Sequence, residues 1–163
     1  MELKTISKAS IPRALALCER YRLLNEPEQA ESICRDVLEI DPQNQDALRM
    51  LLLALTELFG QKRADVFEQA EHVASQLTNP YERIYYEGIV YERWGRSKLE
   101  EGVPAYIAGD WLQKAMSRFE EAEKIKPADD DSALLRWNTC ARLLKRVPQT
   151  MAESAVHEMH FGD

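Results

Sequence analysis

The segment Ala115–Pro127, A-M-S-R-F-E-E-A-E-K-I-K-P, decides the fold. Ala115, Phe119 and Ala122 are separated by four and three residues, so they lie on one face of a helix. Small side chains at Ala115 and Ala122 let a second helix approach closely, while Phe119 fills the gap to a neighbouring pair of helices. Pro127 ends the helix because it has no backbone N–H to continue it. The segment predicts the second helix of a tight helical hairpin.

The same pattern recurs along the chain. A copy that begins 85 residues upstream consists of Ala30, Cys34, Val37 and Pro42. A weaker third copy has Ala70, Ala74 and Leu77, with Pro80 two residues early. Self-similarity of this kind indicates a repeat protein built from stacked hairpins.

These spacings resemble the second helix of the tetratricopeptide repeat (TPR), and the chain is similar to small bacterial-type TPR proteins of about three repeats. Gly109, Asp110 and Trp111 look like the turn that precedes this helix in the family. First helices match in part, at Ala14, Cys18 and Tyr21, at Ile84, Gly88 and Tyr91, and at Ala133, Trp137 and Cys140. The resemblance spans about residues 11–147. It implies an all-α fold of about seven helices, in which antiparallel hairpins stack in a right-handed superhelix, an α-solenoid.

Capping and helix-breaking residues predict the helix ends. We expect Asn25 and Glu28 to form a capping box, Gly60 to end the third helix in the left-handed conformation, Asn79 to cap the fifth, and Pro148 to stop the last. No alternating β-branched runs indicate strands. The predicted division is a lead at 1–10, a single domain at 11–147 with hairpins at about 11–42, 45–78 and 80–127 and a closing helix at 132–147, and a tail at 148–163 that is flexible or a short helix.

Two hairpins are longer than a standard repeat of about 34 residues. The second carries about six extra residues around Gln61–Ala64, and the third about fifteen between Arg96 and Trp111. We expect the third to consist of lengthened helices that meet near Gly102 and project beyond the stack. Its apolar residues Tyr106, Ile107 and Trp111 need cover from the fifth helix or from a partner. This hairpin competes with the groove described below as a docking surface.

Composition excludes several classes of function. The 28 acidic and 21 basic residues give a net charge of -7, which repels phosphate backbones and anionic lipids, so neither nucleic acid nor membrane is an expected partner. The three cysteines are far apart and lack metal-binding spacing, which predicts free thiols in a reducing compartment. We find no signal peptide and no apolar run of membrane-spanning length, so the expected location is cytoplasmic.

Catalytic motifs are also absent from the sequence. The three histidines are His72, His157 and His160, and neither a G-x-S-x-G motif nor a glycine-rich phosphate loop occurs. His157 and His160 could share a helix face and bind a metal, but a solvated tail, or a short helix that folds back or enters a neighbour's groove, is favoured. The run Asp129–Asp131 provides negative charge at a helix N-terminus. We expect no enzyme, no cofactor and no metal.

In the family that the chain resembles, the first helices of the hairpins line a concave groove that selects the ligand. The resemblance therefore implies a partner-binding set of twelve residues: Leu15, Glu19, Arg22, Arg49, Leu53, Thr56, Tyr85, Ile89, Glu92, Leu134, Asn138 and Arg142. Leu15, Leu53, Ile89 and Leu134 would form an apolar ladder flanked by Arg22, Arg49 and Arg142. Such a surface suits a peptide or helix with acidic and apolar residues.

Other interpretations stay open. Each groove residue, taken singly, is as readily explained as a core residue or a neutral surface residue as it is as a contact to a ligand. Tyr81, Tyr85, Tyr86, Tyr91 and Trp94 suggest an aromatic cage, but an aromatic stripe at helical spacing is more often packing. The carboxylate clamp of some family members is missing, since Leu15, Glu19 and Met50 stand in its places. The leading hypothesis is an adaptor that binds another protein; the alternatives are a self-associating protein, such as a homodimer, or a regulatory subunit of an enzyme complex.

Overall fold

The computed structural model describes residues 1–61 and 63–159, with side chains described up to Val147 apart from residue 62. This part of the chain is all-helical and contains no strand, which confirms the predicted all-α class. A short 3₁₀ turn, Lys8–Ser10, precedes seven helices: α1 (Ile11–Leu23), α2 (Pro27–Ile40), α3 (Gln45–Glu57), α4 (Val66–Ser75), α5 (Pro80–Glu100), α6 (Ala105–Glu123) and α7 (Ser132–Met159).

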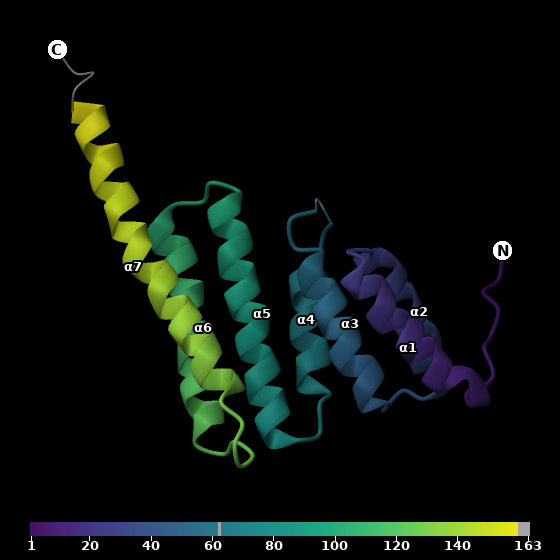
Figure 1. The fold of residues 1–163 in the computed structure, drawn as a ribbon. Coiled ribbons are helices and arrows are strands. Elements are labelled where there is room, and N and C mark those ends of the chain that lie inside the picture. Colours follow the sequence, from purple (N-terminus) through teal and green to yellow (C-terminus); the bar gives the residue numbers. More distant parts are fainter. Residues whose placement is uncertain (62, 160–163) are drawn as a thin grey trace.

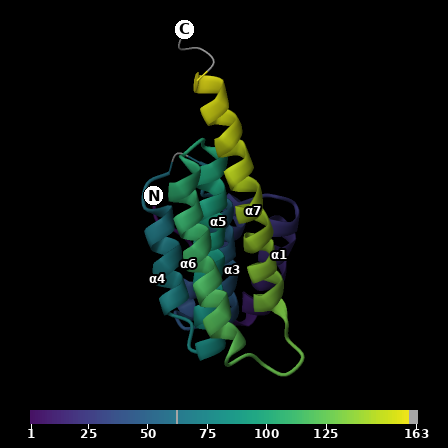
Figure 2. The ribbon, with the colours of Figure 1, turned by 90° about the vertical axis from the view of Figure 1, so that its left-hand side faces the viewer.

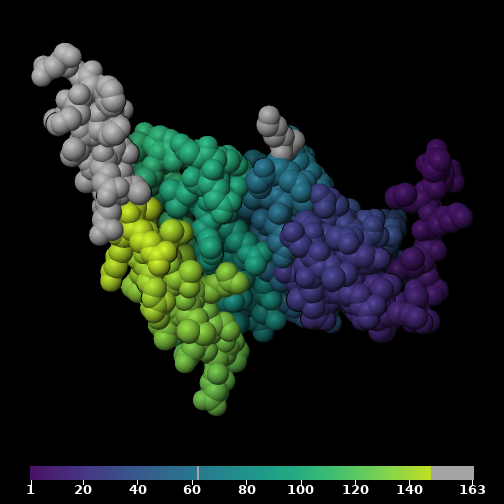
Figure 3. Space-filling view, turned by 45° about the horizontal axis from the view of Figure 1, so that its top comes forward, coloured from purple at the N-terminus to yellow at the C-terminus, as the bar shows by residue number. Residues whose placement is uncertain are grey.

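Consecutive helices run antiparallel and pack against each other in sequence order, from α1 at one end of the molecule to α7 at the other (Figure 1). The space-filling view shows the same order across the surface (Figure 3). Seen from the α7 end, α4 and α6 lie on one side and α1 and α7 on the other (Figure 2). Because α1 also contacts α3, and α3 contacts α5, we call the side of α1, α3, α5 and α7 the odd-helix side.

Two main groups of buried side chains form the core, and α5 joins them. The first group fills the space between α1, α2, α3 and α4 and includes Val90 of α5. The second lies between α5, α6 and α7 and includes Ile89 of α5. Each group excludes water from apolar surface, which is the main source of stability in a fold of this size.

Small residues bring α5 and α6 together. Ala115, Phe119 and Ala122 of α6 are fully buried, as the repeat pattern predicts. Gly88 of α5 lies directly against Phe119, since a Cβ atom at Gly88 would stand only 2.6 Å from the phenyl ring. A Cβ atom at Gly95 would lie 3.1 Å from the carbonyl oxygen of Ala108. Glycine is required in α5 by close packing and not by backbone conformation.

Two asparagines begin helices as N-caps. The Asn44 side chain accepts a hydrogen bond from the Ala47 N–H at 2.9 Å, and Asn79 accepts one from the Glu82 N–H at 3.1 Å. Each satisfies a backbone donor that has no partner inside the helix. The predicted cap at Asn79 is therefore confirmed.

Other predicted helix ends are wrong. Asn25 has a φ of 60°, the left-handed geometry that asparagine tolerates, so it forms the turn before α2 and does not cap it. The third helix ends at Glu57, because the Leu58 N–H already donates to the Leu55 carbonyl in a tighter turn. Positive φ then occurs at Asp65 before α4, and Gly60 does not adopt it. The turn at Gly102, with φ 79°, does lie where the predicted long helices α5 and α6 meet.

Two further differences concern α6 and α7. The predicted turn at Gly109–Trp111 lies inside α6, where Gly109 is buried and faces Leu144 of α7, so its small size serves packing. The last helix does not stop before Pro148, because α7 continues to Met159. A proline inside a helix removes one backbone hydrogen bond, which disfavours the helix without forbidding it. The side chains of 148–159, and all of 160–163, lie outside the described residues, and with them both tail histidines.

Candidate functional site

A chain of polar contacts crosses the odd-helix side and links four helices. Arg22 of α1 donates from Nη2 to Oε1 of Glu57 on α3 at 2.5 Å. Arg93 of α5 donates from Nη1 to Oγ1 of Thr56 on α3 at 2.6 Å and lies 3.7 Å from the same Glu57 oxygen. Arg22 and Arg93 therefore link α1 and α5 to α3.

Glu92 extends this series of polar contacts from α5 to α7. Arg136 of α7 donates from Nη1 to Oε2 of Glu92 at 3.1 Å, and Arg96, one turn along α5, lies 3.5 Å from Oε1. The Glu92 side chain is 1% exposed, and its Oε1 has no hydrogen-bond partner among the described residues. We call the six residues Arg22, Glu57, Glu92, Arg93, Arg96 and Arg136 the arginine cluster.

Positive charge predominates in this cluster. Its four guanidinium groups face two carboxylates, which leaves a surplus of two positive charges (4 − 2) in a chain whose net charge is -7. Burial, and then the nearby charge of Arg136, lower the pKa of Arg93. For Arg136, burial alone would lower the pKa, but the Glu92 carboxylate and the Tyr85 side chain together outweigh it and the pKa is raised. A negative group brought to this surface would therefore be attracted.

Four of the twelve predicted groove residues belong to this network or bind it. Arg22 and Glu92 are members, and the Thr56 hydroxyl and the Leu53 carbonyl accept hydrogen bonds from Arg93. Tyr85 is half-buried and stacks on Tyr81, with ring centroids 5.7 Å apart.

The predicted apolar ladder is wrong as a continuous exposed surface. Ile89 is 2% exposed and packs in the core among residues of α5 and α6, because it faces the interior of the stack. Leu15 and Leu53 are half-buried against core residues. Leu134 is 42% exposed, but with Asn138 it lines a separate cavity of about 260 Å³ beside α6.

The remaining predicted residues lie at the edges of the odd-helix side. Arg49 is paired with Glu82 at 2.8 Å and with Asp46, so its charge is balanced. Glu19 and Arg142 are exposed. Of the predicted charged residues, Arg22 and Glu92 therefore join the arginine cluster, and Glu19, Arg49 and Arg142 do not.

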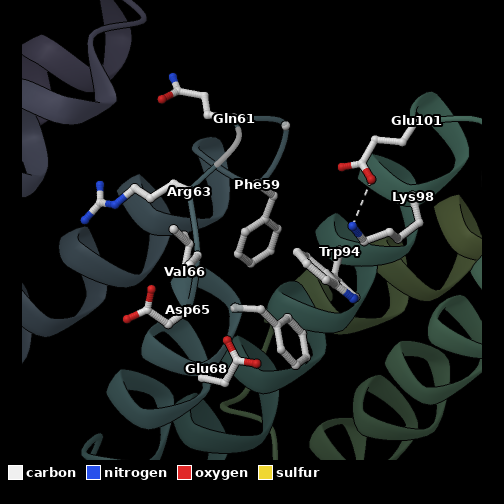
Figure 4. A pocket seen from close by; sticks show the side chains of 12 residues that line it. Phe59, Gln61, Arg63, Asp65, Val66, Glu68, Trp94, Lys98 and Glu101 are labelled. Atoms are coloured by element: carbon white, nitrogen blue, oxygen red, sulfur yellow. Dashed lines mark hydrogen bonds and ion pairs between the residues drawn. The ribbon is translucent and has the colours of Figure 1, made fainter.

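A larger cavity of about 600 Å³ opens between the α3–α4 connection and α5 (Figure 4). Phe59, Phe67 and Trp94 form its apolar wall, and the Trp94 ring centroid lies 5.1 Å from that of Phe59 and 4.7 Å from that of Phe67. Its two basic side chains are engaged by carboxylates, Lys98 by Glu101 at 2.9 Å and Arg63 by Glu31 at 2.5 Å. The cavity offers apolar contact, with little free positive charge.

The aromatic residues of α5 are packing residues first. Tyr81 and Tyr85 lie in the core around Phe119, and Trp94 packs against the first core group. Trp111 of the long hairpin is covered by Tyr91 and Phe67, at centroid distances of 5.6 and 5.1 Å. Tyr106 and Ile107, which were also expected to need cover, are 63% and 40% exposed.

Sequence reasoning missed Glu57, Arg93, Arg96 and Arg136. Glu57 and Arg93 each follow a predicted groove residue, Thr56 and Glu92, by one position. One residue is about 100° of rotation around a helix, so a small error in helix orientation exchanges one for the other. The arginine-rich stretch of α5, in which Arg93 and Arg96 lie three residues apart, was the available signal.

No group of three metal-ligating side chains occurs in the described residues. Within the same part of the chain, every helix is too short or too polar to cross a membrane. Comparisons with protein-family models, with curated proteins and with solved structures gave no match.

Proposed function

We propose that the protein is a TPR-like helical scaffold that binds a segment of another protein along the odd-helix side. The observation that carries the proposal is the arginine cluster, in which three helices, α1, α5 and α7, direct four guanidinium groups toward two carboxylates on α3 and α5. Proteins rarely gather like charges on neighbouring helices without a compensating group, because each additional cation raises the repulsion. An acidic partner segment supplies that compensation.

The partner that fits this surface carries carboxylates beside apolar side chains. Arginine forms two parallel hydrogen bonds with a carboxylate, which gives orientation as well as attraction. Arg136 and Arg96 keep 30% and 50% of their side chains exposed, so they have donors free to face a ligand. The half-buried Leu53 lies on α3 beside the cluster and offers apolar contact.

The test compares two arginines that each pair with a glutamate of α5, although Arg118 also pairs with Glu121 on its own helix. Arg136 of α7 lies 3.1 Å from Glu92, and Arg118 of α6 lies 3.1 Å from Glu87. The probe is a fluorescently labelled twelve-residue peptide of leucine and glutamate, with a lysine-for-glutamate peptide as its counterpart. Fluorescence anisotropy measures binding to the wild-type protein and to the Arg136→Gln and Arg118→Gln variants.

We expect the acidic peptide to bind more tightly than the basic one, and Arg136→Gln to weaken that binding about fivefold, about 1 kcal/mol. Arg118→Gln should leave it unchanged, although both variants lose one positive charge. Raising the salt concentration should weaken binding in all three proteins. No preference for the acidic peptide, or equal losses in the two variants, would contradict the proposal.

Self-association is a second candidate, favoured by one observation. Leu134 and Leu135 of α7, the last helix of the row, are 42% and 64% exposed. A second copy could cover this end, as expected for stacks of few helical repeats. Light scattering across a hundredfold range of concentration tests it; a mass that stays at one chain, 18.8 kDa, excludes this candidate.

A further inference from the structure

Two cysteines from different helices meet in the core of the first hairpin. Cys18 of α1 and Cys34 of α2 have their Sγ atoms 3.1 Å apart, and neither side chain is exposed. The sequence predicts three separated free thiols, because these two lie 16 positions apart in the chain. The packing of α1 on α2 brings them into contact.

We propose that Cys18 and Cys34 form a reversible disulfide that locks the first hairpin. The bond needs the two sulfurs to approach from 3.1 Å to about 2.05 Å, which is a movement of about 1 Å. The third cysteine, Cys140, lies in the other core group between α5 and α7 and serves as an internal control. This proposal is independent of the acidic-partner proposal.

The chemistry is thiol–disulfide exchange with a low-molecular-weight disulfide such as oxidised glutathione. The Cys18 thiolate attacks one glutathione sulfur, breaks its S–S bond and releases one glutathione thiolate, which takes up a proton. The Cys34 thiol loses its proton and attacks the Cys18 sulfur, and the second glutathione leaves. Two protein thiols are oxidised by two electrons, and one glutathione disulfide is reduced to two thiols.

The environment distinguishes the attacking sulfur from the resolving one. The hydrogen bond from Cys34 lowers the pKa of Cys18, although burial raises it. The positive charge of Arg22, one turn away, also lowers the pKa of Cys18. The pKa of Cys34 is raised by the same hydrogen bond and by burial. A thiolate therefore forms more readily at Cys18, and Cys34 attacks second.

Access to the buried pair requires local opening of α1. This helix lies at the end of the row and packs only on α2, α3 and the preceding turn among the element contacts described. Terminal elements with few neighbours open at lower free energy than the centre of a core. Because Arg22 lies on the same helix, the disulfide would also hold this member of the arginine cluster in place.

The experiment incubates the folded protein with excess oxidised glutathione, blocks the remaining thiols, and measures intact mass and proteolytic fragments without reductant. We expect a loss of about 2 Da and a linked fragment pair that contains Cys18 and Cys34. The oxidised protein should melt roughly 5 °C or more above the reduced one, since the bond closes a loop of about 16 residues.

Variants keep the outcome interpretable. Cys140→Ser should retain both the mass loss and the shift in melting temperature, whereas Cys18→Ser and Cys34→Ser should lose both. The fragment map of the wild-type protein does not depend on any variant folding. A link that contains Cys140, a glutathione adduct that persists on Cys18, or oxidation that lowers the melting temperature would overturn the proposal.

Discussion

Two glutamates, Glu31 and Glu92, are buried alike but held differently. Glu31 of α2 is 5% exposed and receives hydrogen bonds from Arg63 at 2.5 and 2.6 Å and from Arg35 at 2.7 and 2.9 Å. Glu92 of α5 is 1% exposed and receives one described hydrogen bond, from Arg136 at 3.1 Å. One carboxylate is fully bonded, and the other is surrounded by arginines that it only partly engages.

Under the proposed function, the difference is one between a structural ion pair and a surface that binds a ligand. A buried carboxylate with all its oxygens bonded fixes local structure, and here Glu31 ties the α3–α4 connection to α2. A buried carboxylate with an unbonded oxygen, in a cluster with surplus positive charge, leaves guanidinium donors for another acceptor. The contrast is open to test by changing each glutamate in the same way.

Removing the charge of Glu31 should have the largest effect on stability. Glu31→Gln leaves two arginines without their carboxylate, and we expect the free energy of unfolding to fall by about 2 kcal/mol, less than for a fully buried pair because both arginines are partly exposed. Glu92→Gln should cost about half as much, since fewer and longer bonds are lost. Urea denaturation of the two variants measures both values; equal losses would remove the distinction drawn between the two sites.

Acid should weaken the Glu31 contacts in a defined direction. Hydrogen bonds from Arg63 and Arg35 hold the pKa of Glu31 below its usual value despite burial. Their contribution is therefore complete above the unfolded-state pKa of about 4.3 and is lost as the pH falls through the lower folded-state pKa. The stability difference between wild type and Glu31→Gln should be constant from about pH 7 to 5 and shrink below that. A difference that grows on acidification would contradict this assignment.

For binding of the acidic peptide, substitution of Glu92 should have a larger effect than substitution of Glu31. Glu92→Gln removes one of the two carboxylates of the arginine cluster, so its surplus of positive charge rises from two to three. We expect the acidic peptide to bind about threefold more tightly to this variant, and Glu31→Gln to leave binding unchanged. Anisotropy titrations give both constants. Weaker binding to Glu92→Gln would mean that Glu92 orients Arg136 and does not compete with the ligand.

Much of the fold was predictable because its signals are local. The burial of Ala115, Phe119 and Ala122 follows from their spacing on one helix face, and Asn79 caps a helix because its side chain reaches a nearby N–H. Helix ends that depend on tertiary contact were not predictable. Gly109 has the residue type of a turn, but it lies inside α6 because Leu144 of α7 packs beside it.

The site was less predictable than the fold. The resemblance pointed to the helices that carry the polar network, yet this network uses Glu57 and Arg93, one position beyond Thr56 and Glu92. Helix rotation within a stack is set by the packing of all its neighbours, such as Phe119 against Gly88, and no single helix pattern determines it. The contact between Cys18 and Cys34 depends in the same way on how α1 lies on α2.

The smallest expected effect on binding concerns Thr56, which connects α3 to the arginine cluster. Its hydroxyl donates to the Leu53 carbonyl at 2.8 Å and accepts from Arg93 at 2.6 Å. Thr56→Val keeps the shape and removes both bonds, and we expect a loss of about 1 kcal/mol in the free energy of unfolding. Arg93 would keep Glu57 as its partner, so acidic-peptide binding should change less than twofold. Thr139→Val, which removes one exposed hydroxyl bond on α7, is the matched control and should leave stability nearly unchanged. A loss of peptide binding in Thr56→Val as large as that in Arg136→Gln would mean that the orientation of Arg93, more than the surplus of charge, determines what this side of the molecule binds.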